Sequence, residues 1–169
     1  MDSMNSWDPM EFMDSMKEWN SWKEHKVYRE IHMQDVPKDA KVTSVRWVYT
    51  RKEDGSAKSR LTVRGDLETR RDLKEGVAPT PADSPTISRL GLRLFFALTI
   101  QQNWNILKFD VPTAFLQQKG DYMKMRKKKL FLKPPKELGR PFDTIWEALK
   151  VPYGCTDAPR AWYYTFRKW

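Results

Sequence analysis

Two β-prone runs joined by a tight-turn signal constrain this chain more than any other feature. Residues 42–51 (VTSVRWVYTR) are rich in β-branched and aromatic side chains, and residues 59–63 share that character. Between them stands Asp54-Gly55, and Asp-Gly between such runs is a strong signal for the tight turn of a β-hairpin. The pattern predicts an antiparallel hairpin. Its cations are Arg46, Arg51, Lys52, Lys58, Arg60 and Arg64. Taken alone, these residues favour a solvated basic face on an ordinary hairpin.

Helical signals stand on both sides of this hairpin. Asp8 is a suitable N-cap, Pro9 suits the first helical position, and Met and Trp residues at helical spacing predict a helix to about Lys26 that packs them onto a core. Ser84-Pro85 begins a second pattern whose apolar residues predict a largely buried helix. A third helix is expected to start at Asp157-Ala158-Pro159.

The remaining segments predict short strands and one connector. Strands are expected at residues 27–31, 104–110, 130–132 and 145–151, and a polar, Pro-containing loop at residues 66–83. Helices and strands therefore mix in an α+β chain. We divide it into an N-terminal helical segment (1–26), the hairpin region with its connector (27–83), and a C-terminal region that opens with the second helix (84–169).

The charge and the cysteine content exclude several classes of protein. A single cysteine, Cys155, excludes a disulfide scaffold and a Cys-rich zinc site, and no apolar run reaches the roughly 20 residues that span a bilayer. An acidic N-terminus is unlike a signal peptide, so we expect an intracellular chain, cytoplasmic or nuclear. The formal charge of +9 favours an acidic partner such as nucleic acid or an anionic surface.

Those charges are unevenly distributed. Residues 1–24 carry six acidic residues against two lysines, whereas residues 121–140 carry eight basic residues against two acidic ones. The basic surplus therefore lies in the hairpin and in residues 121–140.

Asp110 is the acidic residue of greatest interest, because it ends a predicted strand just before Pro112. It can serve as a helix N-cap, a role that Asp fills readily. Alternatively it is part of a Mg²⁺ site, since hard cations prefer oxygen ligands, although one carboxylate cannot complete such a site.

Four segments resemble, in the same order, the reverse transcriptase domain of copia-type retrotransposon polyproteins. Residues 47–65 (WVYTRKEDGSAKSRLTVRG) are similar to that family's WV, K, G and KARLVARG elements. Residues 110–116 (DVPTAFL) are similar to its DVxxAFL, and residues 130–135 (LFLKPP) to its YMxxP. Residues 153–163 (YGCTDAPRAWY) resemble YGLKQAPRAWY. Each segment is only moderately specific, but four in the family's order are hard to obtain by coincidence.

The resemblance implies the fingers and a partial palm of a right-hand polymerase fold. It implies an RNA-directed DNA polymerase that uses Mg²⁺, with an RNA template, a DNA primer and a dNTP as partners. Asp110 is then the first metal-binding aspartate, with the Val111 carbonyl as a further ligand.

It also implies roles for residues that bind the nucleotide and the nucleic acid. Lys58 and Arg60 would reach the triphosphate, Phe115 would crowd a ribose 2′-hydroxyl, and at Gly154 the backbone would closely approach template or nucleotide. Nucleic-acid contacts are expected at Arg64, Lys127, Lys128, Lys129 and Arg160.

The chain also departs from the family pattern. Gln118 stands where the family has the glycine that ends DVxxAFLxG, Glu68 aligns with the glutamine of GFxQ, and Thr156-Asp157 replaces Lys-Gln. The last change places an acid near the expected nucleic-acid path. The basic run at residues 124–129 is either a solvated loop or an added phosphate contact.

One missing motif bears on activity. The family's Tyr-x-Asp-Asp should follow residues 153–163, but no Asp-Asp pair occurs up to Trp169. We therefore expect a chain that lacks the C-terminal part of the palm and cannot polymerise alone. Two alternatives stay open: a non-catalytic, basic nucleic-acid-binding module, and a degenerate transposon-derived reading frame with a marginal or unfolded product.

Overall fold

The described part of the chain is built on a five-stranded sheet with the strand order β1-β5-β4-β2-β3. The computed structural model describes residues 8–74, 76, 81–82, 84–119, 121–126 and 128–168. The strands are β1 (Tyr28–His32), β2 (Val42–Arg51), β3 (Ala57–Val63), β4 (Phe131–Lys133) and β5 (Thr144–Ala148). β2 and β4 run parallel, and the other neighbouring strands run antiparallel.

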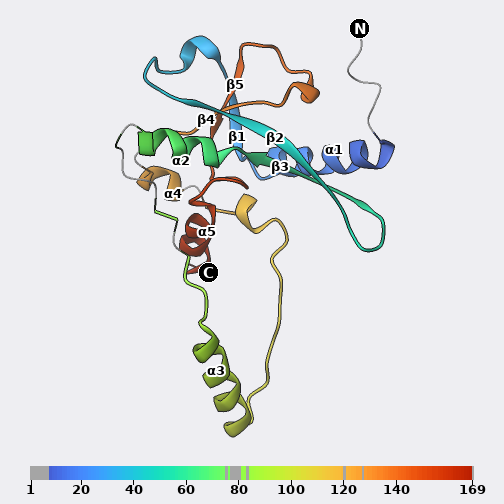
Figure 1. Ribbon diagram of the computed structural model, residues 1–169, viewed down its shortest axis with the longest axis vertical. Coiled ribbons are helices and arrows are strands. Elements are labelled where there is room, and N and C mark those ends of the chain that lie inside the picture. The colour runs from blue at the N-terminus through green and yellow to red at the C-terminus, as the bar shows by residue number, and fades with distance from the viewer. Residues whose placement is uncertain are drawn as a thin grey trace.

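The described residues also form five α-helices and three 3-10 helices, which accompany the sheet (Figure 1). The α-helices are α1 (Pro9–Glu24), α2 (Gly65–Lys74), α3 (Arg89–Gln101), α4 (Asp121–Met125) and α5 (Ala158–Phe166). The 3-10 helices are η1 (Met33–Asp35), η2 (Ala114–Leu116) and η3 (Lys136–Leu138). The fold is therefore mixed, as expected. The expected three-segment division stays a prediction.

The predicted hairpin is confirmed as β2 and β3, in register from Val45 opposite Val63 to Arg51 opposite Ala57. Gly55 has φ +79° at the turn, a left-handed conformation that glycine adopts without steric cost. The strands expected near residues 27–31, 130–132 and 145–151 are likewise confirmed as β1, β4 and β5.

Helix α1 covers the open edge of β3. Its predicted start is confirmed, because the Asp8 carboxylate accepts a hydrogen bond from the Met10 amide. The carboxylates of Asp14 and Glu18, one turn apart, accept hydrogen bonds from the amides of Ser59 and Leu61. These two side chains thus satisfy donors that an edge strand would otherwise present to solvent or to another chain.

The core lies between α1 and the sheet. Trp22 and Trp146 are fully buried, and Tyr28 stacks on Trp146 with ring centroids 4.0 Å apart. The expectation that the helically spaced Met and Trp residues of α1 pack onto a core holds for Trp22 but is wrong for Met13, whose side chain is 58% exposed. The hydrogen bonds to β3 turn the side of α1 that carries Asp14 and Glu18 toward the sheet, and Met13 lies outside it.

Helix α2 corrects the predicted loop at residues 66–83, of which residues 75, 77–80 and 83 lie outside the described part. The polar composition of this segment hid a helix whose stability comes from tertiary contacts. Asp72 is 5% exposed and pairs with Lys128, its Oδ1 lying 3.2 Å from the lysine Nζ.

Helix α3 also differs from expectation. Its N-cap is Ser88 rather than a residue near Ser84, and the predicted burial of its apolar face is wrong: Leu90 is 77% and Ile100 81% exposed. Figure 1 shows α3 at one end of the molecule, away from the sheet. An apolar pattern indicates that a helix needs cover, but it does not say which segment supplies it.

The strand expected at residues 104–110 is absent from the described structure. These residues are extended and exposed, with Leu107 at 89% and Phe109 at 71%. A strand requires a neighbour for its backbone hydrogen bonds, and this segment runs outside the sheet. None of the described helices is both long and apolar enough to cross a membrane.

Candidate functional site

The ring of Tyr153 joins three of the four motif segments. The Arg60 guanidinium of β3 lies 5.7 Å from the centroid of that ring, and the ring of Phe115 in η2 lies 5.3 Å from it. The strand alternation explains which side of β3 is used. Ser59, Leu61 and Val63 are buried on one face, so Arg60 points from the other, where it is exposed. Lys58 shares the face of Arg60.

The turn at Gly154 packs against the end of β3 and thereby holds this cluster in place. The Val63 amide donates a hydrogen bond of 2.8 Å to the Tyr153 carbonyl. Gly154 has φ +89°, and a Cβ added there would lie 2.1 Å from the Val63 carbonyl oxygen. Packing against β3 is therefore sufficient to require glycine at this position. The predicted approach of a ligand to Gly154 stays a prediction.

Charge in the cluster is mixed rather than purely basic. Burial raises the pKa of the Tyr153 hydroxyl, the Glu18 carboxylate raises it further, and Arg60 acts against both. Burial also raises the pKa of Glu18, against the lowering effect of its hydrogen bonds and of Arg60. Arg60 is thus an exposed cation beside a partly buried carboxylate and over an aromatic ring, and its guanidinium can still engage an anionic oxygen.

Asp110 and Val111 lie on the extended segment that leads into η2. Asp110 is exposed and Val111 half-buried. In the described part of the chain, no group of three or more His, Cys, Asp or Glu side chains could hold a metal ion. Mg²⁺ is usually held by one or two carboxylates together with substrate phosphates. The described residues, with Asp110 alone, therefore do not fit a complete Mg²⁺ site.

The residues predicted to contact nucleic acid are spread over several elements. Lys128 and Lys129 are exposed, but Lys128 pairs with Asp72, and the Nζ of Lys129 lies 3.0 Å from Glu147. The Arg160 guanidinium lies 5.7 Å from the centroid of the Tyr164 ring. Arg64 is half-buried at the end of β3, and Lys127 lies outside the described residues. Nucleic-acid contact at these positions stays a prediction.

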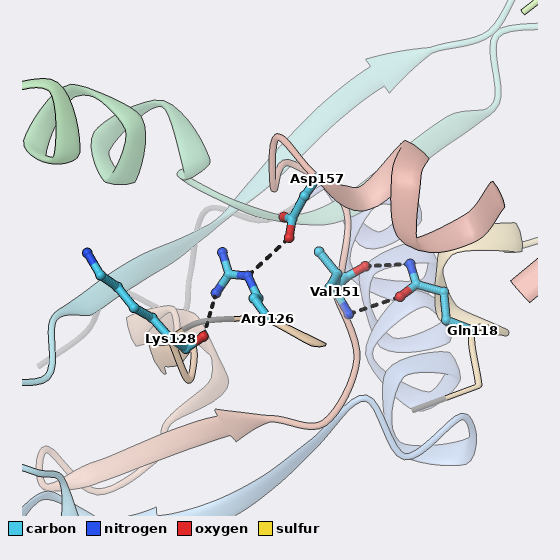
Figure 2. A network of polar contacts seen from close by, with 5 residues as sticks. All are labelled: Gln118, Arg126, Lys128, Val151 and Asp157. Atoms are coloured by element: carbon cyan, nitrogen blue, oxygen red, sulfur yellow. Dashed lines mark hydrogen bonds and ion pairs between the residues drawn. The ribbon is translucent and has the colours of Figure 1, made fainter. Parts of the chain in front are cut away.

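Two buried polar contacts near the cluster were not predicted from the sequence (Figure 2). The Gln118 side chain pairs with both backbone groups of Val151, and Arg126 Nε lies 3.1 Å from Asp157 Oδ2. The side chains of Arg126 and Asp157 are 4% and 0% exposed. Asp157 occupies the N-cap position of α5, as expected for a helix start, but its carboxylate does not cap the helix.

These two contacts explain two departures from the family pattern. Gln118 and Asp157 are both positions where the sequence differs from its motif, and that difference was the available signal. Asp157 does not bring an exposed acid toward a nucleic-acid path, because its carboxylate is buried against Arg126. Burial and the negative charge of Asp157 also raise the pKa of Tyr122 to about 12.

Comparisons with known proteins agree with the motif order. The family model described as "Reverse transcriptase (RNA-dependent DNA polymerase)" matches residues 26–169. The Retrovirus-related Pol polyprotein from transposon RE2 of Arabidopsis thaliana is 30% identical over 137 residues, covering 78% of this chain and 9% of that protein. The Transposon Ty1-DR5 Gag-Pol polyprotein of Saccharomyces cerevisiae is 26% identical over 157 residues, covering 93% of this chain and 8% of that protein.

The chain therefore spans less than a tenth of the length of these relatives. No solved structure matches it.

Proposed function

The chain belongs to the reverse transcriptase (RNA-dependent DNA polymerase) family, and from this premise we propose that it forms the part of such a polymerase that holds the incoming deoxynucleotide and the template–primer. The observation that carries the proposal is the contact of Tyr153 with both Arg60 and Phe115. It brings to one place the segments that resemble the family's KARLVARG, DVxxAFL and YGLKQAPRAWY.

Arg60 and Lys58 bind the triphosphate in this proposal. Arg60 is exposed and held near the Tyr153 ring, so its planar guanidinium is oriented before a phosphate arrives. Lys58 adds a second cation on the same strand face. Phe115 selects deoxyribose by crowding a 2′-hydroxyl, and the backbone at Gly154 closely approaches the nucleotide or template.

The hairpin of β2 and β3 corresponds to the fingers in this assignment, and the segment from Asp110 through α5 to part of the palm. In the complete family domain, Asp110 and the Val111 carbonyl would hold Mg²⁺. Arg64, Lys127, Lys128, Lys129 and Arg160 would contact the phosphates of the template and primer.

We further propose that these 169 residues bind the nucleotide and the template–primer but do not extend a primer. The sequence contains no Asp-Asp pair, and its described part contains no group of three potential metal ligands. Primer extension by the 169-residue chain with Mg²⁺ and dNTPs tests this directly. Extension by the wild type that Asp110→Asn abolishes would overturn the proposal of inactivity.

Nucleotide binding tests the proposed site. Calorimetric titration with dTTP should show at least about 10-fold weaker binding for Arg60→Gln, because a hydrogen bond to a charged group contributes about 1.5–3 kcal/mol. Arg93→Gln is the matched control, since it removes the same charge from an exposed position on α3. Equal loss in both variants would contradict a specific role for Arg60. Phe115→Ala should reduce the preference for dTTP over UTP.

A further inference from the structure

A groove between α2 and β2 carries positive charge that none of the roles above uses. It encloses about 520 Å³, within the range of roughly 300–1,000 Å³ that small-molecule sites occupy. Its cations are Arg70, Lys74 and Lys133, and its apolar floor is formed by Met33, Val42 and Leu67. Among the described residues that line it, none is acidic.

The local structure explains why the cations gather here. Arg70 and Lys74 stand one turn apart on α2 and therefore project from the same side of that helix. Lys133 ends β4 opposite Ser44 of β2, in the parallel pair at the middle of the sheet. One acid, Asp72, stands between Arg70 and Lys74 in the sequence. It is turned away from the groove and pairs with Lys128.

An aromatic ring stands beside one of these cations. Phe142 is 79% exposed, and the Nζ of Lys133 lies 4.1 Å from the centroid of its ring. Thr43 also lines a second hollow of about 310 Å³, whose walls carry Lys41, Lys128 and Lys129 together with the acids Asp39 and Asp72. The second hollow is therefore mixed in charge, whereas the described lining of the groove contains cations and no acid.

We propose that the groove of Arg70, Lys74 and Lys133 binds a short single-stranded segment of nucleic acid. The three cations contact successive phosphates, and Phe142 stacks on a base. The apolar floor takes a sugar or a second base. Single-strand sites combine these elements, a basic groove for the backbone and aromatic rings for the bases. The inference rests on the proposed function only in taking nucleic acid as the substrate.

Fluorescence anisotropy with labelled oligo(dT) of 12 nucleotides tests the groove on the whole chain. Arg70→Gln/Lys74→Gln should weaken binding several-fold and reduce the slope of log K against log salt by about 1.4, since each phosphate contact on a single strand contributes about 0.7. Phe142→Ala should weaken binding with little change in that slope. The charge-matched control is Arg89→Gln/Arg93→Gln, both exposed on α3.

The possible results separate the groove from the proposed function. Equal losses of affinity in the two double variants would overturn the proposal for the groove. Poly-glutamate that competes as well as unlabelled oligo(dT) would also overturn it, because the site would then recognise any polyanion. A wild type that binds neither oligo(dT) nor dTTP would overturn the proposed function as well. Circular dichroism confirms that each variant, changed only at exposed positions, keeps its helices.

Discussion

The side-chain amide of Gln118 closes two hydrogen bonds with the backbone of Val151. Its Nε2 donates to the Val151 carbonyl at 2.8 Å, and its Oε1 accepts from the Val151 amide at 3.2 Å. Gln118 is 2% exposed and Val151 is fully buried, so no solvent competes for these groups. The pairing connects the residues just after the DVPTAFL segment to the segment that leads from β5 to the turn at Tyr153.

Gln118→Gly, which restores the family residue, should therefore destabilise this chain. It leaves the buried amide and carbonyl of Val151 without partners, at a cost of about 1–3 kcal/mol for each unsatisfied group. Urea denaturation should show a free energy of unfolding lower by at least about 2 kcal/mol. Gln101→Ala, at an exposed position at the end of α3, is the control and should change little. A variant as stable as the wild type would show that the pair contributes nothing.

Gly154→Ala should be at least as damaging. Its added Cβ would meet the Val63 carbonyl oxygen at 2.1 Å and the Thr62 Cγ2 at 2.5 Å, and φ +89° is strained for alanine. The turn must shift away from β3, which moves the Tyr153 ring from Arg60. We expect lower thermal stability together with weaker dTTP binding. Gly139→Ala is the matched control, since φ is +61° there but nothing lies within 4 Å. A similar loss in both would point to backbone strain alone.

The ion pair between Arg126 and Asp157 should behave as a coupled unit. Asp157→Ala leaves a guanidinium that is 4% exposed without its carboxylate, and breaking such a buried pair typically costs about 3–5 kcal/mol. Arg126→Met/Asp157→Leu removes both charges and should recover most of that loss. A double-mutant cycle measured by urea denaturation gives the coupling. Additive losses would contradict it.

Local patterns predicted those parts of the fold that depend on neighbouring residues. The hairpin followed from its β-prone runs and Asp54-Gly55, and the start of α1 from Asp8-Pro9. The pattern of α2 was missed because the helix depends on distant partners, such as Lys128 for Asp72. The exposure of α3 and of Phe109 was missed because periodicity gives no information on what covers an apolar face.

The candidate site likewise contains residues that the sequence predicted and contacts that it did not. The motif resemblance singled out Arg60, Phe115 and the segment of Tyr153, and the structure brings these three together. It could not show that Asp157 would be buried by Arg126, a residue 31 positions earlier in the chain. Motif order carries over between relatives, whereas compensating contacts at departing positions depend on this chain's own packing.

Stability should depend on pH through Glu18, at the junction of α1 and β3. Burial raises its pKa above the ordinary value of 4.5, against the opposing hydrogen bonds from Trp22 and Leu61. Folding thus favours the protonated form of Glu18. The contribution of Glu18 to the stability of the fold is therefore fully present below about pH 4.5 and is lost as the pH rises through the raised pKa. Glu18→Gln keeps an oxygen acceptor without the charge and should be more stable than the wild type at pH 7, by several tenths of a kcal/mol.

That advantage should shrink toward zero at pH 4, where the wild-type carboxyl is itself largely protonated. Urea denaturation of both proteins at pH 4, 5, 6 and 7 measures the difference, and groups that titrate alike in the two proteins cancel. Glu24→Gln, which removes the same charge at the exposed end of α1, is the control variant in these measurements. An advantage of Glu18→Gln that grew as the pH fell would mean that ionised Glu18 stabilises the edge of β3. In that case the carboxylate's hydrogen bond to Leu61 would outweigh the cost of burying its charge.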